Sequence, residues 1–142
     1  MRALASLPRK RILVVDDEPD LLEFLHLRLD LAGYDPFRAR SGEECLDCIA
    51  NIRPDALIID LNMPGMGGYG VLRTMQEDRL LATIPTMVLT GRNQADDVKQ
   101  ALALGAVTYL AKPFEDKLFL SRVRQLVKRR GATSAVKAVV YV

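Results

Sequence analysis

Long apolar runs are missing from this sequence: no stretch approaches the about 18 residues that a membrane-spanning helix needs. Residues 1–11 carry a short apolar patch followed by basic residues, which reverses the order found in a secretory signal. Excess charge is missing too, because 20 Lys and Arg against 18 Asp and Glu give a net charge of +2. We therefore expect a cytoplasmic protein that makes no membrane contact and no direct contact with nucleic acid.

Cysteine and histidine are scarce, with two Cys and one His in 142 residues. Cys45 and Cys48 form one C-x-x-C pair, and without a second pair this spacing does not predict a zinc site. The two thiols share a helical face with Ile49 and Ile52, which favours packing in the core. His26 has no kinase-type sequence around it and is expected at the surface or its boundary.

Nucleotide-binding motifs are absent or out of place. No G-K-[ST] occurs, so the chain has no P-loop. The stretch "GMGGYG" at residues 65–70 satisfies G-x-G-x-x-G, but "LNMP" separates it from the preceding apolar run. A dinucleotide fingerprint follows its strand directly, so we do not expect a nucleotide site here.

What the sequence does contain is a regular alternation of apolar runs and amphipathic segments. Strands are predicted at residues 11–17, 34–40, 55–60, 84–90 and 106–112. Helices are predicted near residues 22–32, 41–52, 69–78, 94–104 and 115–130. This alternation predicts an α/β fold, doubly wound, with a five-stranded parallel sheet covered by five helices. Pro36 favours an edge position for the second strand.

Finer details of the helices also follow from the pattern. Ser41 and Glu44 match a capping box, and Gly33 and Gly131 are expected to end the first and last helices. One face of the fourth helix is expected to carry Val98, Ala101 and Leu102. The apolar seam of the last helix is expected to consist of Leu118, Val123, Leu126 and Val127.

A chain of this length suits a single domain. We expect an N-terminal extension at residues 1–9, the domain at 10–130, and a C-terminal segment at 131–142. The last segment contains "AVKAVVYV", which is apolar and β-branched. It is either a tail that docks on an apolar surface or sheet edge, or a truncated linker.

Polar side chains gather where the predicted strands end. Asp16 and Asp17 end the first strand, Asp60 the third, Thr90 the fourth and Lys112 the fifth. Ligands of such sheets bind beyond these carboxyl ends. Any one of these residues alone is ordinary, and Asp60 by itself is as well explained as a turn residue. Together they place three carboxylates, a hydroxyl and an ammonium on one rim.

This combination predicts a particular chemistry. Three neighbouring carboxylates repel one another, and Mg²⁺ relieves that repulsion because it prefers oxygen ligands. A nearby ammonium and hydroxyl suit a bound phosphoryl group. A carboxylate can itself be the acceptor, giving an aspartyl phosphate. These residues therefore predict a Mg²⁺-dependent phosphoryl site at this rim.

The motifs "VVDDE", "LIIDLNMPGMGG", "MVLTG" and "YLAKPF", in this order and spacing, resemble the receiver domain of two-component response regulators. The resemblance covers roughly residues 10–130, with no departure at the five rim positions. It implies a flavodoxin-like strand order, 2-1-3-4-5.

The resemblance also implies a role for each rim residue. Asp60 would be the phosphorylation site. Asp17 and Asp60 would ligate Mg²⁺, or Mn²⁺ in its place, together with the backbone carbonyl of Asn62, while Asp16 would hold a metal-bound water. A cis bond at Lys112–Pro113 would aim the lysine inward.

Further roles concern the phosphoryl group itself. The resemblance implies that Lys112 pairs with it, that Thr90 hydrogen-bonds to it, and that Tyr109 moves together with Thr90. Asn62 and Arg92 would flank the path of the hydrolytic water. Because the guanidinium of Arg92 cannot act as a general base, we expect a long-lived phosphorylated state.

The predicted function is a signalling switch rather than an enzyme. A sensor histidine kinase or histidine phosphotransfer protein would phosphorylate the domain, which would then change its binding to a partner or output domain. A homodimer through the fourth helix, fifth strand and last helix is one such outcome. The alternatives are a Mg²⁺-dependent phosphohydrolase, which Asn62 disfavours because it cannot act as a general acid, and a phosphate-independent docking module.

Overall fold

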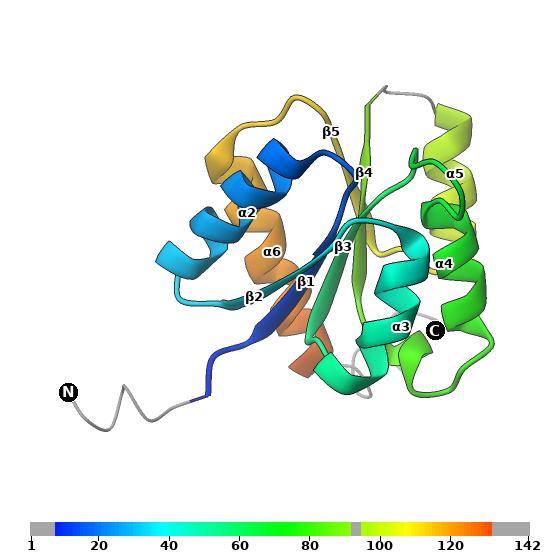
Figure 1. Ribbon diagram of the computed structural model, residues 1–142, viewed down its shortest axis with the longest axis horizontal. Helices are drawn as coiled ribbons and strands as arrows, with labels where there is room; N and C mark the ends of the chain where they lie inside the picture. Colours follow the sequence, from blue (N-terminus) through cyan, green and yellow to red (C-terminus); the bar gives the residue numbers. More distant parts are fainter. Residues whose placement is uncertain (1–7, 92–94, 132–142) are drawn as a thin grey trace, which may run out of the picture.

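The computed structural model describes residues 8–91 and 95–131, and Figure 1 shows their arrangement. Five strands alternate with the helices: β1 (Arg11–Val15), β2 (Asp35–Ala39), β3 (Ala56–Asp60), β4 (Thr86–Thr90) and β5 (Thr108–Ala111). The helices are α2 (Pro19–Leu31), α3 (Gly42–Ile52), α4 (Gly68–Gln76), α5 (Ala95–Ala103) and α6 (Asp116–Gly131), with a short 3-10 helix, η1 (Leu81–Thr83).

All strand pairs are parallel, and the sheet has the order β2-β1-β3-β4-β5. The predicted doubly wound fold and its 2-1-3-4-5 order are therefore confirmed. Pro36 lies on the edge strand β2, opposite Ile12 of β1. A proline there removes one backbone donor without interrupting the centre of the sheet.

Helices cover both faces of the sheet (Figure 1). On one face α3, α4 and α5 pack against alternate strand residues such as Leu57, Ile59 and Val88. On the other face α2 and α6 pack against the intervening residues, among them Ile58 and Leu89. The three central strands are almost fully buried, which explains why they read as continuous apolar runs.

Local sequence signals account for several helix ends. The hydroxyl oxygen of Ser41 accepts a hydrogen bond from the backbone N–H of Glu44 at 3.1 Å, which caps α3 as predicted. Gly33 follows α2 with φ of +98°, a conformation that favours glycine. Gly131, which is expected to end the last helix, is the final residue of α6 within the part of the chain that the structure describes.

Two expectations about helix faces were wrong. Leu102 is expected on one face with Val98 and Ala101, and Leu118 in the apolar seam of the last helix, yet both side chains are 43% exposed. In α6 the neighbouring Phe119 is fully buried instead and stacks on Phe114, with ring centroids 5.6 Å apart. Each apolar run offered several adjacent hydrophobic residues, and packing against the sheet selected a different one.

The cysteines and the histidine lie where the sequence indicated. Cys45 is fully buried and Cys48 is half-buried, both within or against the core cluster under α3. Burial raises the pKa of the Cys45 thiol to about 12, which keeps it protonated and unreactive at neutral pH. His26 is half-buried on α2. Within the described ranges, none of the helices is both long and apolar enough to cross a membrane.

Candidate functional site

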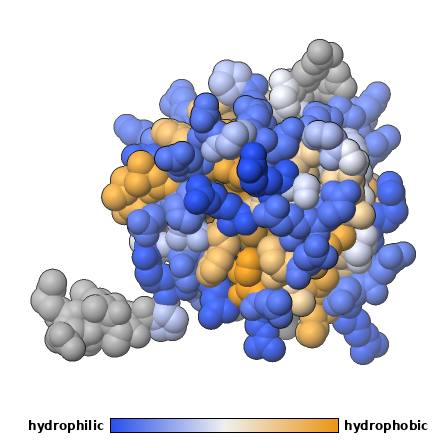
Figure 2. All heavy atoms as spheres, in the orientation of Figure 1, coloured by the Kyte–Doolittle hydropathy of each residue, from blue (hydrophilic) through white to orange (hydrophobic). Residues whose placement is uncertain are grey.

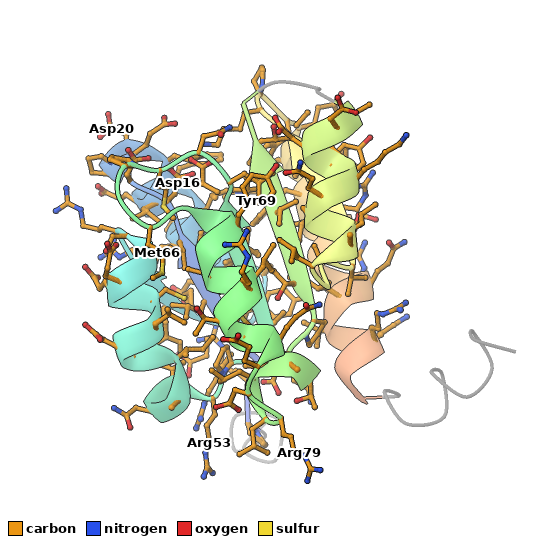
Figure 3. The ribbon with its side chains drawn as sticks, turned by 90° about the vertical axis from the view of Figure 1, so that its right-hand side faces the viewer. Asp16, Asp20, Arg53, Met66, Tyr69 and Arg79 are labelled. Carbon is orange, nitrogen blue, oxygen red and sulfur yellow. The ribbon has the colours of Figure 1, made fainter. Side chains whose placement is uncertain are left out.

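The predicted rim residues come together at the carboxyl ends of the strands. In the side view of Figure 3, Asp16 and Tyr69 lie toward one end of the molecule, and Arg53 and Arg79 lie at the other. The sheet explains this placement, because β1, β3, β4 and β5 run parallel and end at the same edge. Asp60 and Thr90 are the last residues of β3 and β4, and Asp16 and Lys112 directly follow β1 and β5.

Three carboxylates form a compact cluster. One oxygen each of Asp16, Asp17 and Asp60 lies within 4.8 Å of the others. Asp16 is fully buried and Asp60 is only 3% exposed. Burial, followed by repulsion from Asp16, raises the pKa of the Asp60 carboxyl, although the backbone N–H of Asn62 and Lys112 oppose that rise. Ionised Asp60 is therefore costly in this site unless a cation compensates it.

Lys112 is a cation at the centre of the cluster. Its Nζ lies 2.8 Å from Asp16 Oδ2, 3.1 Å from Glu18 Oε1 and 3.2 Å from Asp60 Oδ2. Burial lowers the pKa of Lys112, but the bonds to Asp16 and Glu18 outweigh it, so the pKa is raised overall. The ammonium is therefore permanently charged. The peptide bond between Lys112 and Pro113 is cis.

Thr90 and Tyr109 lie on the adjacent strands β4 and β5. The backbone N–H of Lys112 donates to the carbonyl of Thr90 at 2.7 Å, which fixes the end of β5 against β4. Thr90 pairs with Ala111 and Val88 pairs with Tyr109, so Thr90 and Tyr109 are on the same face of the sheet. Thr90 is fully buried and Tyr109 is half-buried.

The glycine-rich loop after β3 is folded tightly against the strand end. The backbone N–H of Asn62 donates to Oδ1 of Asp60 at 3.0 Å. Gly65 has φ of +73°, and a Cβ on Gly68 would lie 2.7 Å from the carbonyl oxygen of Asp60. The glycines therefore allow the loop backbone to approach the end of β3 closely, and this packing explains them without a nucleotide site. Glu43 accepts a hydrogen bond from the backbone N–H of Met66 at 3.3 Å and secures the loop from α3.

The donor set fits a hard divalent cation. Three converging carboxylates supply oxygen ligands and an excess of negative charge that one lysine does not neutralise. Mg²⁺ prefers such carboxylates together with water, and Mn²⁺ suits the same oxygen ligands. This acidic pocket can therefore hold a metal ion.

Two contacts at this end of the molecule were not anticipated. Glu18 belongs to the "DDE" motif but was given no role, although its position just before α2 places it on the same rim. Tyr69 of α4 donates its hydroxyl hydrogen to Asp97 of α5, and no sequence pattern links those two positions. Arg92 lies outside the described residues.

The comparison with known families gives a consistent result. Residues 12–124 match the family model described as response regulator receiver domain. PrrA, a transcriptional regulatory protein of Mycobacterium leprae, is 41% identical over 127 residues, which are 87% of this chain and 52% of that protein. PhoB of Pseudomonas aeruginosa, the phosphate regulon transcriptional regulatory protein, is 32% identical over 86% of this chain and 53% of its own length. The chain thus spans about half the length of these curated relatives.

Solved structures agree with this result. A putative response regulator of Chloroflexus aurantiacus superposes with a TM-score of 0.81 at 38% identity, covering 85% of this chain and 99% of that one. The receiver domain of a signal transduction histidine kinase of Syntrophus aciditrophicus gives 0.77 at 34% identity, covering 84% and 90%. With the family match, the parallel sheet and the acid cluster at its edge, this chain belongs to the receiver domains of two-component response regulators.

Proposed function

We propose that Asp60 is the phosphoryl acceptor of this receiver domain, in a reaction that requires Mg²⁺. The observation that supports it is the position of Asp60, the last residue of β3, within the acid cluster and 3.2 Å from Lys112. An Asp60 oxygen bonds to phosphorus while the bond from phosphorus to the donor breaks. The electron pair of that bond leaves with the donor.

The other rim residues have two separate roles, metal binding and phosphoryl binding. Asp17 and Asp60 would hold Mg²⁺ through their carboxylates, the carbonyl of Asn62 would be a further ligand, and Asp16 would hold a metal-bound water. When bound, Mg²⁺ would supply positive charge that offsets the repulsion between these carboxylates and an incoming phosphoryl group. Lys112 then pairs with one phosphoryl oxygen, for which its raised pKa keeps it charged. The Thr90 hydroxyl donates to another, and Tyr109 follows the movement of Thr90.

The donor is a sensor histidine kinase or a histidine phosphotransfer protein, in the cytoplasm. Relatives with similar sequences are named as transcriptional regulators and one as a DNA-binding response regulator. Phosphorylation of this chain changes partner binding at the surface of α5, β5 and α6, either to a second copy or to an output domain. The domain is a switch that transfers a phosphoryl group only to itself.

The protein donor docks on the exposed face of α2. Phe24, Leu27 and Leu31 are 48%, 53% and 69% exposed and recur at helical spacing. Figure 2 shows an apolar patch on the side of the molecule where Figure 1 places α2. Because α2 begins two residues after Asp17, a helical partner on this face brings its histidine close to Asp60.

One assay separates the switch from a phosphohydrolase. Purified protein is incubated with acetyl phosphate and Mg²⁺, and both intact protein mass and released phosphate are followed. We expect one phosphoryl group per chain, no gain in EDTA and none in Asp60→Asn. Many turnovers of released phosphate without any gain in protein mass would instead identify a phosphohydrolase.

A further inference from the structure

The side chain of Glu18 contacts a residue that is distant in the sequence. It is the N-cap residue of α2, a position where the shorter side chains of Ser, Thr, Asp and Asn commonly accept a hydrogen bond from their own helix. No such bond is formed, and Pro19 follows in the first turn. Instead, Oε1 of Glu18 lies 3.1 Å from Nζ of Lys112, a residue 94 positions away in the chain. The Glu18 carboxylate therefore contacts the rim residue Lys112 and does not cap α2.

Three carboxylates contact the Lys112 ammonium, but their side chains differ in exposure to solvent. The Asp16 side chain is fully buried and the Asp60 side chain is 5% exposed, so neither can turn away into water. The Glu18 side chain is 61% exposed. Lys112 has three N–H donors, and one oxygen of each of the three carboxylates lies within 3.2 Å of its Nζ. When a phosphoryl oxygen binds the Lys112 ammonium, the Glu18 carboxylate can move away into water with the smallest loss of free energy among the three.

Glu18 also contributes charge to the path of the donor. Its oxygen and that of Asp60 contact the same nitrogen, so they are at most roughly 6 Å apart. Four carboxylates and one ammonium leave the rim strongly negative. Glu18 is not among the residues that the resemblance to receiver domains implies as metal ligands. A bound metal would therefore not neutralise its charge directly, and that charge repels a negatively charged phosphoryl donor that approaches Asp60.

We propose that Glu18 is a positioning residue for phosphoryl transfer. Its carboxylate holds the Lys112 ammonium at rest, gives it up when a phosphoryl group arrives, and slows transfer from negatively charged donors. This inference rests on the proposed function of Asp60. It predicts that the chain discriminates against small anionic donors while a docked protein partner, which brings its own surface charges, is less affected.

The test compares Glu18→Gln with Asp20→Asn. Asp20 is an exposed acid in the first turn of α2, at the same end of the molecule (Figure 3), and has no described contact with Lys112. With acetyl phosphate and saturating Mg²⁺, Glu18→Gln should be phosphorylated roughly three- to tenfold faster than wild type. Asp20→Asn should change the rate less than twofold. The gain should shrink at high salt and with phosphoramidate, which carries less negative charge.

A second variant separates contact from charge. Glu18→Asp keeps the charge on a shorter side chain, so it should lose the contact to Lys112 and give a smaller gain than Glu18→Gln. A direct readout needs no phosphorylation: the NMR signal of the Lys112 ammonium should shift in both Glu18 variants and not in Asp20→Asn.

Two results would overturn the inference. One is an unchanged Lys112 signal in Glu18→Gln; the other is equal acceleration by Glu18→Gln and Asp20→Asn. Failure of the proposed function looks different, because wild-type protein would then gain no phosphoryl group at all while the Lys112 signal still responded to Glu18.

Discussion

The Tyr69 hydroxyl of α4 lies 3.0 Å from Oδ1 of Asp97 and 3.1 Å from the Asp97 carbonyl oxygen in the first turn of α5. This bond joins the helix that follows the Asp60 loop to the helix at the proposed output surface. Burial, followed by the bond to Asp97, raises the pKa of Tyr69 to about 12. The neutral phenol is therefore the form that holds the two helices together.

Tyr69→Phe should loosen α5 without disturbing the acid cluster. Loss of one hydrogen bond should lower the free energy of unfolding by about 1 kcal/mol. Amide hydrogen exchange should speed up mainly across residues 95–103. Tyr34→Phe is the matched control, because burial raises the pKa of Tyr34 but its hydroxyl has no described hydrogen bond. Equal effects of both changes would show that the bond to Asp97 is not what matters.

The same bond predicts a dependence on alkaline pH. Because the folded pKa of Tyr69 lies above its ordinary value of 10.0, folded protein holds its proton more tightly than unfolded protein. The stabilisation is complete below pH 10 and is lost as pH rises toward 12. Urea unfolding between these values should show a shallower loss of stability in Tyr69→Phe than in wild type. A parallel pH profile for the two proteins would contradict this.

Asp60→Asn should stabilise the metal-free protein. The raised pKa of Asp60 means that its ionised form is less favourable in the folded than in the unfolded chain. Stability therefore falls as pH rises through the folded pKa, and a neutral amide removes that loss. We therefore expect a higher unfolding temperature at neutral pH for the variant than for metal-free wild type. Added Mg²⁺ should stabilise wild type and leave the variant nearly unchanged.

Lys112→Ala should separate metal binding from phosphoryl binding. Its ammonium contacts Asp16 and Asp60, while Asp17 has no described contact with it. Mg²⁺ affinity by NMR titration should stay within about tenfold of wild type, and it can tighten because a competing cation is gone. Phosphorylation should become much slower. Lys128→Ala, an exposed lysine near the opposite end of α6, is the control. Loss of Mg²⁺ binding in Lys112→Ala would contradict the division of roles.

Phe24→Ser and Leu27→Ser should distinguish protein donors from small donors. Both side chains are about half exposed, so the fold should tolerate the changes. Transfer from a phosphorylated histidine partner should fall at least tenfold, whereas phosphorylation by acetyl phosphate should be unaltered. Leu80→Ser is the control, because Leu80 is 79% exposed and lies before η1, away from the rim. An equal loss in the control would argue against α2 as the docking face.

The strand pattern and most of the rim residues could be predicted from the sequence, because in a parallel α/β sheet the polar residues of a site follow directly after buried apolar strands. Parallel strands buried on both faces leave long apolar runs, and their polar ends mark one rim. Asp16, Asp17, Asp60, Thr90 and Lys112 were found in that way. The edge strand was marked by Pro36.

What could not be predicted depends on side-chain packing. Adjacent residues on a helix point about 100° apart, so "KLFLS" does not reveal whether Leu118 or Phe119 faces the sheet. The bond from Glu18 to Lys112 crosses 94 residues, and the Tyr69 bond joins two separate helices. No local spacing encodes such contacts, because they appear only when the elements pack together.

The most direct test of the central claim is to locate the phosphoryl group. Phosphorylated protein is reduced with borohydride, which converts an aspartyl phosphate to homoserine, and the tryptic peptide covering residues 41–73 is sequenced by mass spectrometry. We predict homoserine at position 60, only when Mg²⁺ was present during phosphorylation. Homoserine at Asp55 in that peptide, or at Asp16 or Asp17 elsewhere, would show that Asp60 is not the acceptor.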